Sequence, residues 1–293
     1  MKHCRRNYAT LWIVLILPVL LGWPQSQWAD GHSLFPEPDA PAISPALAVS
    51  VPAAMDGLER NALQLIDVRS LEEFQRFRIA GSIHMPLHTI RTKPFLKSKP
   101  IVLVNEGFSI RHLADACETL NRQGFQATIL AGGLLAWQAG GGPLVGDPFA
   151  MDRMIIVPPH MLAREMGSRH LLIIDAGGSG ENRGAIHGTS VHPIPLIDNP
   201  QNLERITALW VKNRTDPFFR ILISGRNGNE TDLIHRQLTA AGIRQVYLLK
   251  NGWQAYEQYL NDQRLATRAK EDRQVTIGPC TACAPQKEFE RKQ

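Results

Sequence analysis

The sequence repeats one pattern of apolar runs and turns, and this repeat limits the chain to folds built from two similar units. Asp67 and Asp175 end the first apolar run of each copy and lie 108 residues apart, while the later loop and closing-turn positions lie 120 and 119 residues apart. The matching segments are 63–69 with 171–176, 79–86 with 186–195, 101–105 with 221–225, 124–125 with 242–243, and 130–137 with 249–256. Because the order is the same in both copies, a duplicated domain with small insertions explains the pattern.

Each copy alternates short apolar runs with segments of helix length. The runs Leu65-Ile66 and Ile101-Val102-Leu103-Val104 are apolar on both faces, as in strands that are buried from both sides. The helix-length segments end at Gly124 and Gly242, and glycine commonly follows the last residue of a helix. The sequence therefore predicts an α/β fold in which each domain has a parallel sheet flanked by helices.

The domain organisation follows from these patterns. We expect the first domain at residues 55–147 and the second at 153–262, joined through glycines and prolines near 140–148. Residues 30–54 contain many prolines, which remove backbone donors and favour extended chain, so we expect a tether there. Residues 263–293 form a charged C-terminal tail.

The first 29 residues have the pattern of a secretory leader. Lys2, Arg5 and Arg6 precede an apolar run at 11–23. Thirteen helical residues rise only about 20 Å, less than the roughly 30 Å hydrocarbon core of a bilayer. We therefore expect export, to the periplasm or another compartment outside the cytoplasm. The large Trp28 makes a poor cleavage site, so an uncleaved membrane anchor is the alternative.

The charge of the chain argues against binding to nucleic acid. When residues 1–29 are left out, the chain contains 29 Lys and Arg and 27 Asp and Glu, so the formal charge falls from +5 to +2. No basic cluster remains to grip phosphates. The sequence also lacks a P-loop and a dinucleotide-binding fingerprint, and we expect no cofactor.

The repeated motifs resemble those of the tandem-domain rhodanese (sulfurtransferase) family over roughly residues 60–260. The resemblance is carried by Ile66-Asp67-Val68-Arg69, by the segment 81–86 and by the Gly-Gly turn at 132–137, each with a counterpart in the second copy. It implies two α/β domains and transfer of a persulfide sulfur from a donor to a thiophilic acceptor. It also implies a local pair between Asp67 and Arg69.

The chain departs from this family at the nucleophile. Persulfide chemistry needs a thiolate at the head of a loop whose backbone N–H groups converge on the sulfur. By position, the family's cysteine falls on Asn105 in the first copy and on Gly225 in the second, and neither can form a persulfide. The degenerate loops comprise Asn105, Glu106 and Gly107, and Gly225, Arg226, Asn227, Gly228, Asn229, Glu230 and Thr231. The second loop either binds a small anion, which Glu230 would oppose unless paired, or is a solvated turn.

Cys280 and Cys283 form the only other thiol motif, in the tail beyond both domains. A zinc site would need two more ligands, and no second C-x-x-C motif or nearby His supplies them. The pair is therefore a tail disulfide, a mobile thiol arm that carries sulfur or electrons, or a contribution to a partner's metal site. Cys117 has helical spacing from Leu113 and Leu120, so we interpret it as a small packed residue.

These observations favour a binding or regulatory module in sulfur metabolism that recognises a sulfur-containing anion or a periplasmic partner protein. The alternative is a sulfurtransferase or thiol–disulfide carrier that uses Cys280 and Cys283 as its catalytic residues. A purely structural protein, with the tail pair oxidised, is a third reading. The fold cannot decide among them, because one scaffold hosts many functions.

Overall fold

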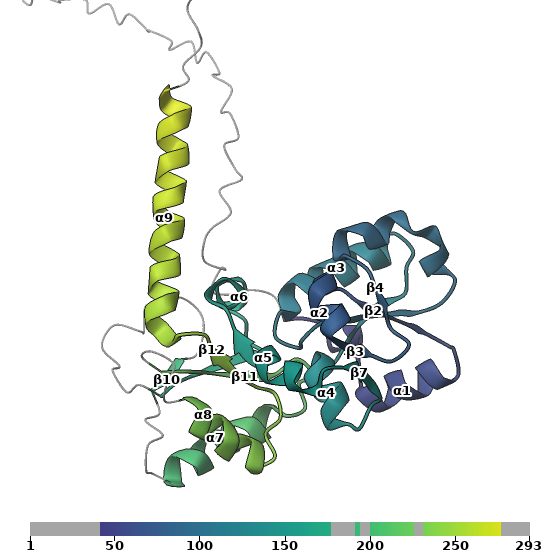
Figure 1. Ribbon diagram of the computed structural model, residues 1–293, viewed down its shortest axis with the longest axis horizontal. Coiled ribbons are helices and arrows are strands. Elements are labelled where there is room, and N and C mark those ends of the chain that lie inside the picture. The colour runs from purple at the N-terminus through teal and green to yellow at the C-terminus, as the bar shows by residue number, and fades with distance from the viewer. Residues whose placement is uncertain (1–41, 177–190, 194–199, 226–230, 277–293) are drawn as a thin grey trace, which may run out of the picture. The chain divides into compact units, whose positions relative to one another are not determined.

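The computed structural model describes residues 42–176, 191–193, 200–225 and 231–276 (Figure 1). Within these residues the chain forms two five-stranded sheets, in which every neighbouring pair of strands is parallel. The first sheet contains β1 (Ala48–Val49), β2 (Gln64–Asp67), β4 (Ile83–His84), β5 (Ile101–Val104) and β6 (Ala127–Leu130). The second contains β8 (Ile156–Val157), β9 (Leu171–Asp175), β10 (Val191–Pro193), β11 (Arg220–Ser224) and β12 (Val246–Leu249).

The two sheets have the same topology. The first has the order β1-β6-β5-β2-β4, and the second, read from β8, has the order β8-β12-β11-β9-β10. If the five strands of each sheet are numbered along the chain, they lie side by side in the order first, fifth, fourth, second, third in both sheets. The prediction of an α/β fold with two parallel sheets is thus confirmed. Below, residues 42–146 are the first half, 147–154 the connecting segment and 155–276 the second half.

Helices cover both faces of each sheet. In the first half they are α1 (Val51–Glu59), α2 (Leu71–Arg76), α3 (Ile110–Arg122) and α4 (Gly133–Ala139), with 3-10 turns η1 (Pro45–Leu47), η2 (Leu87–Thr92) and η3 (Pro94–Lys97). The connecting segment holds η4 (Pro148–Ala150) and α5 (Met151–Met154). The second half has α6 (Pro159–Glu165), α7 (Pro200–Asn213), α8 (Thr231–Ala240) and α9 (Gly252–Thr276). A small antiparallel sheet pairs β3 (Phe77–Ile79) with β7 (Leu144–Gly146).

The central strands are mostly apolar because both of their faces are covered; the exceptions are Arg220 and Ser224 at the two ends of β11. Every residue of β5, β11 and β12 is buried. Along β5, Ile101 and Leu103 pack in one core cluster together with residues of α3, whereas Val102 and Val104 pack in another with residues of α1 and α4. This alternation is the period of two that a strand imposes on its side chains.

The predicted tether is wrong for the residues that the structure describes. Ala48 and Val49 form an edge strand of the first sheet beside β6, and Val51 and Ala54 are buried in its core. The prolines mark helix starts, a position where their missing N–H costs nothing. Pro45 follows the cap Ser44, and α1 begins with a proline in its first turn after the cap Ser50. The first domain therefore starts before residue 55.

The end of the second half also differs from the expected boundary at residue 262. Helix α9 runs on to Thr276 as one long helix (Figure 1). Its sequence beyond 262 contains neither proline nor glycine until Gly278, and it is rich in residues that favour helix. In the part of the chain that the structure describes, no helix is long and apolar enough to cross a membrane. The expected leader at 1–29 lies outside those residues.

Candidate functional site

The first candidate loop leaves β5 at the carboxyl end of the sheet and leads into α3. Its first residue, Asn105, is only 4% exposed. The Asn105 Oδ1 atom accepts a hydrogen bond from the Gly107 N–H at 2.9 Å, and Nδ2 donates to the Ser109 carbonyl at 2.9 Å. The side chain at the position where the resemblance implies a nucleophile thus closes the loop on itself.

Glu106 completes this internal bonding. Its Oε1 atom accepts a hydrogen bond from the Ser109 N–H at 3.0 Å. In a loop that binds an anion, backbone N–H groups of this kind point at the ligand. Here the N–H groups of Gly107 and Ser109 are already bonded to side chains of their own loop.

Gly107 allows the loop to approach the neighbouring chain segments closely. It has a φ of 108°, and a Cβ atom there would lie 2.4 Å from the Gly132 carbonyl oxygen and 2.5 Å from the Tyr247 hydroxyl. The Leu134 N–H also donates to the Asn105 carbonyl at 2.9 Å. A larger residue at position 107 would push the loop away from both halves.

The next residue, Phe108, leaves its own half and packs in the second. It is 0% exposed and belongs to a core cluster formed otherwise by second-half residues such as Val157, Leu171 and Trp253. Its ring lies 5.2 Å from that of Tyr247 in an edge-on arrangement. Since Phe108 sits in the middle of the candidate loop, this loop is a contact between the two halves.

A buried ion pair from the second half lies at the start of α3. Glu165 and Arg220 pair with each other, and the side chain of each is 1% exposed. Glu165 Oε1 also accepts a hydrogen bond from the Arg111 N–H, in the first turn of α3, at 3.0 Å. Burial raises the pKa of Glu165, while Arg220 and the Arg111 N–H act in the opposite direction. The Arg220 guanidinium stands over the Phe108 ring, 5.3 Å from its centroid.

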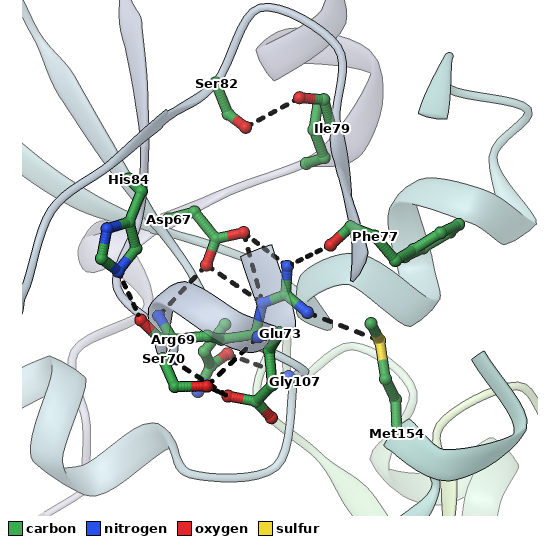
Figure 2. A network of polar contacts seen from close by, with 11 residues as sticks. Asp67, Arg69, Ser70, Glu73, Phe77, Ile79, Ser82, His84, Gly107 and Met154 are labelled. Carbon is green, nitrogen blue, oxygen red and sulfur yellow. Dashed lines mark hydrogen bonds and ion pairs between the residues drawn. The ribbon is translucent and has the colours of Figure 1, made fainter. Parts of the chain in front are cut away.

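Figure 2 shows a second buried pair, formed by Asp67 and Arg69 of the first half. The Arg69 guanidinium binds Asp67 Oδ2 at 2.6 Å and also donates to the Phe77 carbonyl at 2.6 Å. The local pair implied by the resemblance is therefore present. In the second half, the corresponding Asp175 instead accepts a hydrogen bond from the Trp253 indole N–H at 3.2 Å.

The second candidate loop is described only at its two ends. Gly225 is buried, and its carbonyl accepts hydrogen bonds from the Trp253 N–H at 3.1 Å and from Ser224 Oγ at 3.2 Å. Thr231 begins α8 and is 2% exposed. The residues Arg226, Asn227, Gly228, Asn229 and Glu230 lie outside the described residues, so the expected anion cradle stays a prediction.

Of the cysteines considered in the sequence, the structure describes Cys117 but not Cys280 or Cys283. Cys117 is 0% exposed in the core of the first half, and burial raises the pKa of its thiol to about 12. The interpretation as a packed residue is confirmed, since a nucleophilic cysteine needs an accessible thiolate. Cys280 and Cys283 lie outside the described residues. Among the residues that are described, no three His, Cys, Asp or Glu side chains form a group that could hold a metal ion.

With this geometry in place, comparison with known families identifies the first half. Residues 50–140 match the model of the rhodanese-like domain. No curated protein matches the chain. The rhodanese-like domain links the first half to a sulfur-transfer-related family, and its matched region contains both the Asp67–Arg69 pair and the loop that begins at Asn105.

Several solved structures are also similar to this chain. The Alr3790 protein from Anabaena sp. is 28% identical over 36% of this chain and 87% of its own, with a TM-score of 0.31. A rhodanese-related protein from Thermoplasma volcanium is 24% identical over 34% of this chain and 98% of its own, with a TM-score of 0.30. A thiosulfate sulfurtransferase from Pseudomonas aeruginosa is 20% identical over 72% of this chain and 42% of its own, with a TM-score of 0.30.

Sequence reasoning missed the residues through which the second half holds the rhodanese-like loop, namely Glu165, Arg220 and Tyr247. Arg220 gave a usable signal, because it is a charged residue inside the apolar run from Phe218 to Ile223. A charge in such a run must be paired when the strand is buried. The sequence contains no comparable signal for Glu165.

Proposed function

We propose that this chain is a tandem rhodanese-like binding module that transfers no sulfur through its two family loops. The observation that carries the proposal is the bonding of the first loop. Asn105 stands in place of a thiol, and the N–H groups of Gly107 and Ser109 are bonded within the loop. A persulfide needs both a thiolate and donors that are open to it. Gly225 likewise has no side chain for this chemistry.

The proposal extends to the second half and to the location of the protein. The shared strand order supports a second rhodanese-like domain there. The basic and apolar pattern of residues 1–29 supports export, with the leader either cleaved or kept as an anchor. In this role the module recognises a sulfur-containing anion or a partner protein in the same compartment.

The test is thiosulfate-to-cyanide sulfur transfer by the reduced full-length chain, beside a Cys280→Ser/Cys283→Ser variant. We expect both proteins to give no more thiocyanate than the buffer blank, while an active sulfurtransferase in the same assay turns over. Turnover that disappears in the variant would assign the chemistry to the tail thiols and overturn the proposal. Turnover that persists in the variant would overturn it as well, because another group would then carry the sulfur.

A further inference from the structure

A cleft of about 470 Å³ lies beside the first loop, and both halves and the connecting segment contribute to its walls. Glu106 comes from the loop, Met154 from the connecting segment, Met161 from α6, and Lys250 from the turn after β12. This volume lies in the range of clefts that hold small molecules. Neither the loop bonding nor the core packing described above uses the space.

Two cations in the lining have no hydrogen-bond or ion-pair partner for their side chains among the residues that the structure describes. The side chains of Arg153 and Lys250 are exposed, and neither makes a hydrogen bond or an ion pair within the described residues. The third cation, Arg76, is bonded to Glu72 at 2.8 Å. Two unpaired positive charges on one cleft favour an anion as its ligand.

The two carboxylates of the lining are already engaged. Glu73 Oε2 accepts hydrogen bonds from the Ser70 N–H at 3.0 Å and from Ser70 Oγ at 2.6 Å, which caps α2 (Figure 2). Glu106 Oε1 accepts from the Ser109 N–H. These carboxylates do not compete for Arg153 and Lys250, but their negative charge remains in the wall. The cleft therefore suits a ligand with one negative charge better than a polyanion.

The rest of the lining is mostly apolar. Met161 and Pro158 contribute from the second half and Val157 from the edge strand β8. Met154 points toward the buried Arg69, with its sulfur 4.0 Å from Arg69 Nη1 (Figure 2). Methionine side chains adapt to irregular shapes and make favourable contacts with aromatic rings.

We propose that this cleft binds a small organic monoanion, with its charge at Arg153 and Lys250 and an apolar or aromatic group against Met154 and Met161. The inference rests on the proposed function, for which it names the class of ligand. A sulfonate and a carboxylate both carry the required single negative charge. The attached apolar group distinguishes such a ligand from free sulfate or thiosulfate, which lack one.

The test is a calorimetric titration of the full-length chain with benzenesulfonate, with sulfate and benzyl alcohol as single-feature comparisons. We expect benzenesulfonate to bind at least about fivefold more tightly than either comparison. The Arg153→Ala/Lys250→Ala variant is expected to weaken binding about fivefold or more, as for the loss of two partly exposed charge contacts. The Arg268→Ala/Lys270→Ala variant removes the same charge from exposed positions of α9, outside the cleft, and should keep the wild-type affinity.

A second readout locates the ligand independently of these variants. Benzenesulfonate should shift the methyl NMR signals of Met154 and Met161, assigned through Met→Leu variants, and leave that of Met85 in place. Absent binding, equal affinity in both double variants, or unshifted Met154 and Met161 signals would each overturn the proposal. The titration contains no sulfur donor or acceptor, so sulfur-transfer activity would overturn the non-catalytic assignment and leave the cleft result intact.

Discussion

At the scale of single residues, the Glu165–Arg220 pair connects the two halves most directly. Glu165 binds Arg220 within the second half and the Arg111 N–H in the first turn of α3. A carboxylate at this end of a helix is favourable because the helix dipole is positive there. One buried side chain therefore satisfies donors from both halves.

Replacing Glu165 by alanine should lower the free energy of unfolding by about 3–5 kcal/mol, because Arg220 would remain buried without its counter-ion. The Glu165→Leu/Arg220→Met variant should lose less than this single variant, since it leaves no unpaired charge. Urea denaturation measures both. Glu72→Ala removes a carboxylate from an exposed ion pair with Arg76 and should cost only about 0–1 kcal/mol. A double variant as unstable as the single one would contradict the role given to the pair.

At the scale of elements, the segment between β5 and α3 is a structural contact. Phe108 is its anchor, since the ring is fully buried among residues of the second half. The Tyr247 hydroxyl lies 3.5 Å from the Glu106 carbonyl, on the same segment. A loop that in the family presents a reactive group to a substrate is here fixed between two cores.

Phe108→Ala should reduce the free energy of unfolding by about 3–5 kcal/mol, as is usual when a buried aromatic ring is deleted and a cavity remains. Phe149→Ala is the matched control, because that ring is 77% exposed, and its loss should change stability by no more than about 0.5 kcal/mol. Thermal or urea unfolding distinguishes the two. Similar stability of both variants would show that the loop does not hold the halves together.

At the scale of the whole molecule, stability should depend on pH through histidines that the fold holds neutral. Burial lowers the pKa of His160, His192 and His235, and nearby arginines add to the effect at His160 and His192. For His235, Asp232 and Asp152 oppose the effect of burial without reversing it. Below about pH 6.5 the unfolded chain takes up protons more readily than the folded one, so this contribution to stability is lost as the pH falls.

The unfolding free energy of the His235→Gln variant should therefore fall less between pH 7 and pH 5 than that of the wild type. His235 is the best choice because its side chain lies on α8, which packs on β11 and β12 of the second sheet. Urea denaturation at several pH values gives the two slopes. Equal slopes would mean that His235 is not responsible for any of the acid sensitivity.

The sequence predicted the fold better than the site, and particular residues explain the difference. The apolar runs, the glycines after the helices and the repeated Asp67 and Asp175 predicted two parallel sheets because local patterns determine strands and helices. The prolines of residues 30–54 predict a tether, whereas in the structure Pro45 and Pro52 stand in the first turns of helices that are capped by Ser44 and Ser50. The sequence shows that Asn105 replaces the thiol, but it does not show the contacts that hold this loop to the second half, because they come from Glu165 and Tyr247, which are distant in sequence.

Each half places one aromatic ring in the core of the other, and this affects the stability of fragments of the chain. Phe108 completes the packing of the second half, and Phe218, from the second half, lies in the core cluster of the first. The Ile43 N–H adds a further bond between them, to His170 Nε2 at 3.1 Å. A proteolytic or genetic cut in the connecting segment would thus release two fragments with incomplete interiors. Each fragment would expose apolar surface that the intact chain buries, so we expect each to be less stable alone than within the chain.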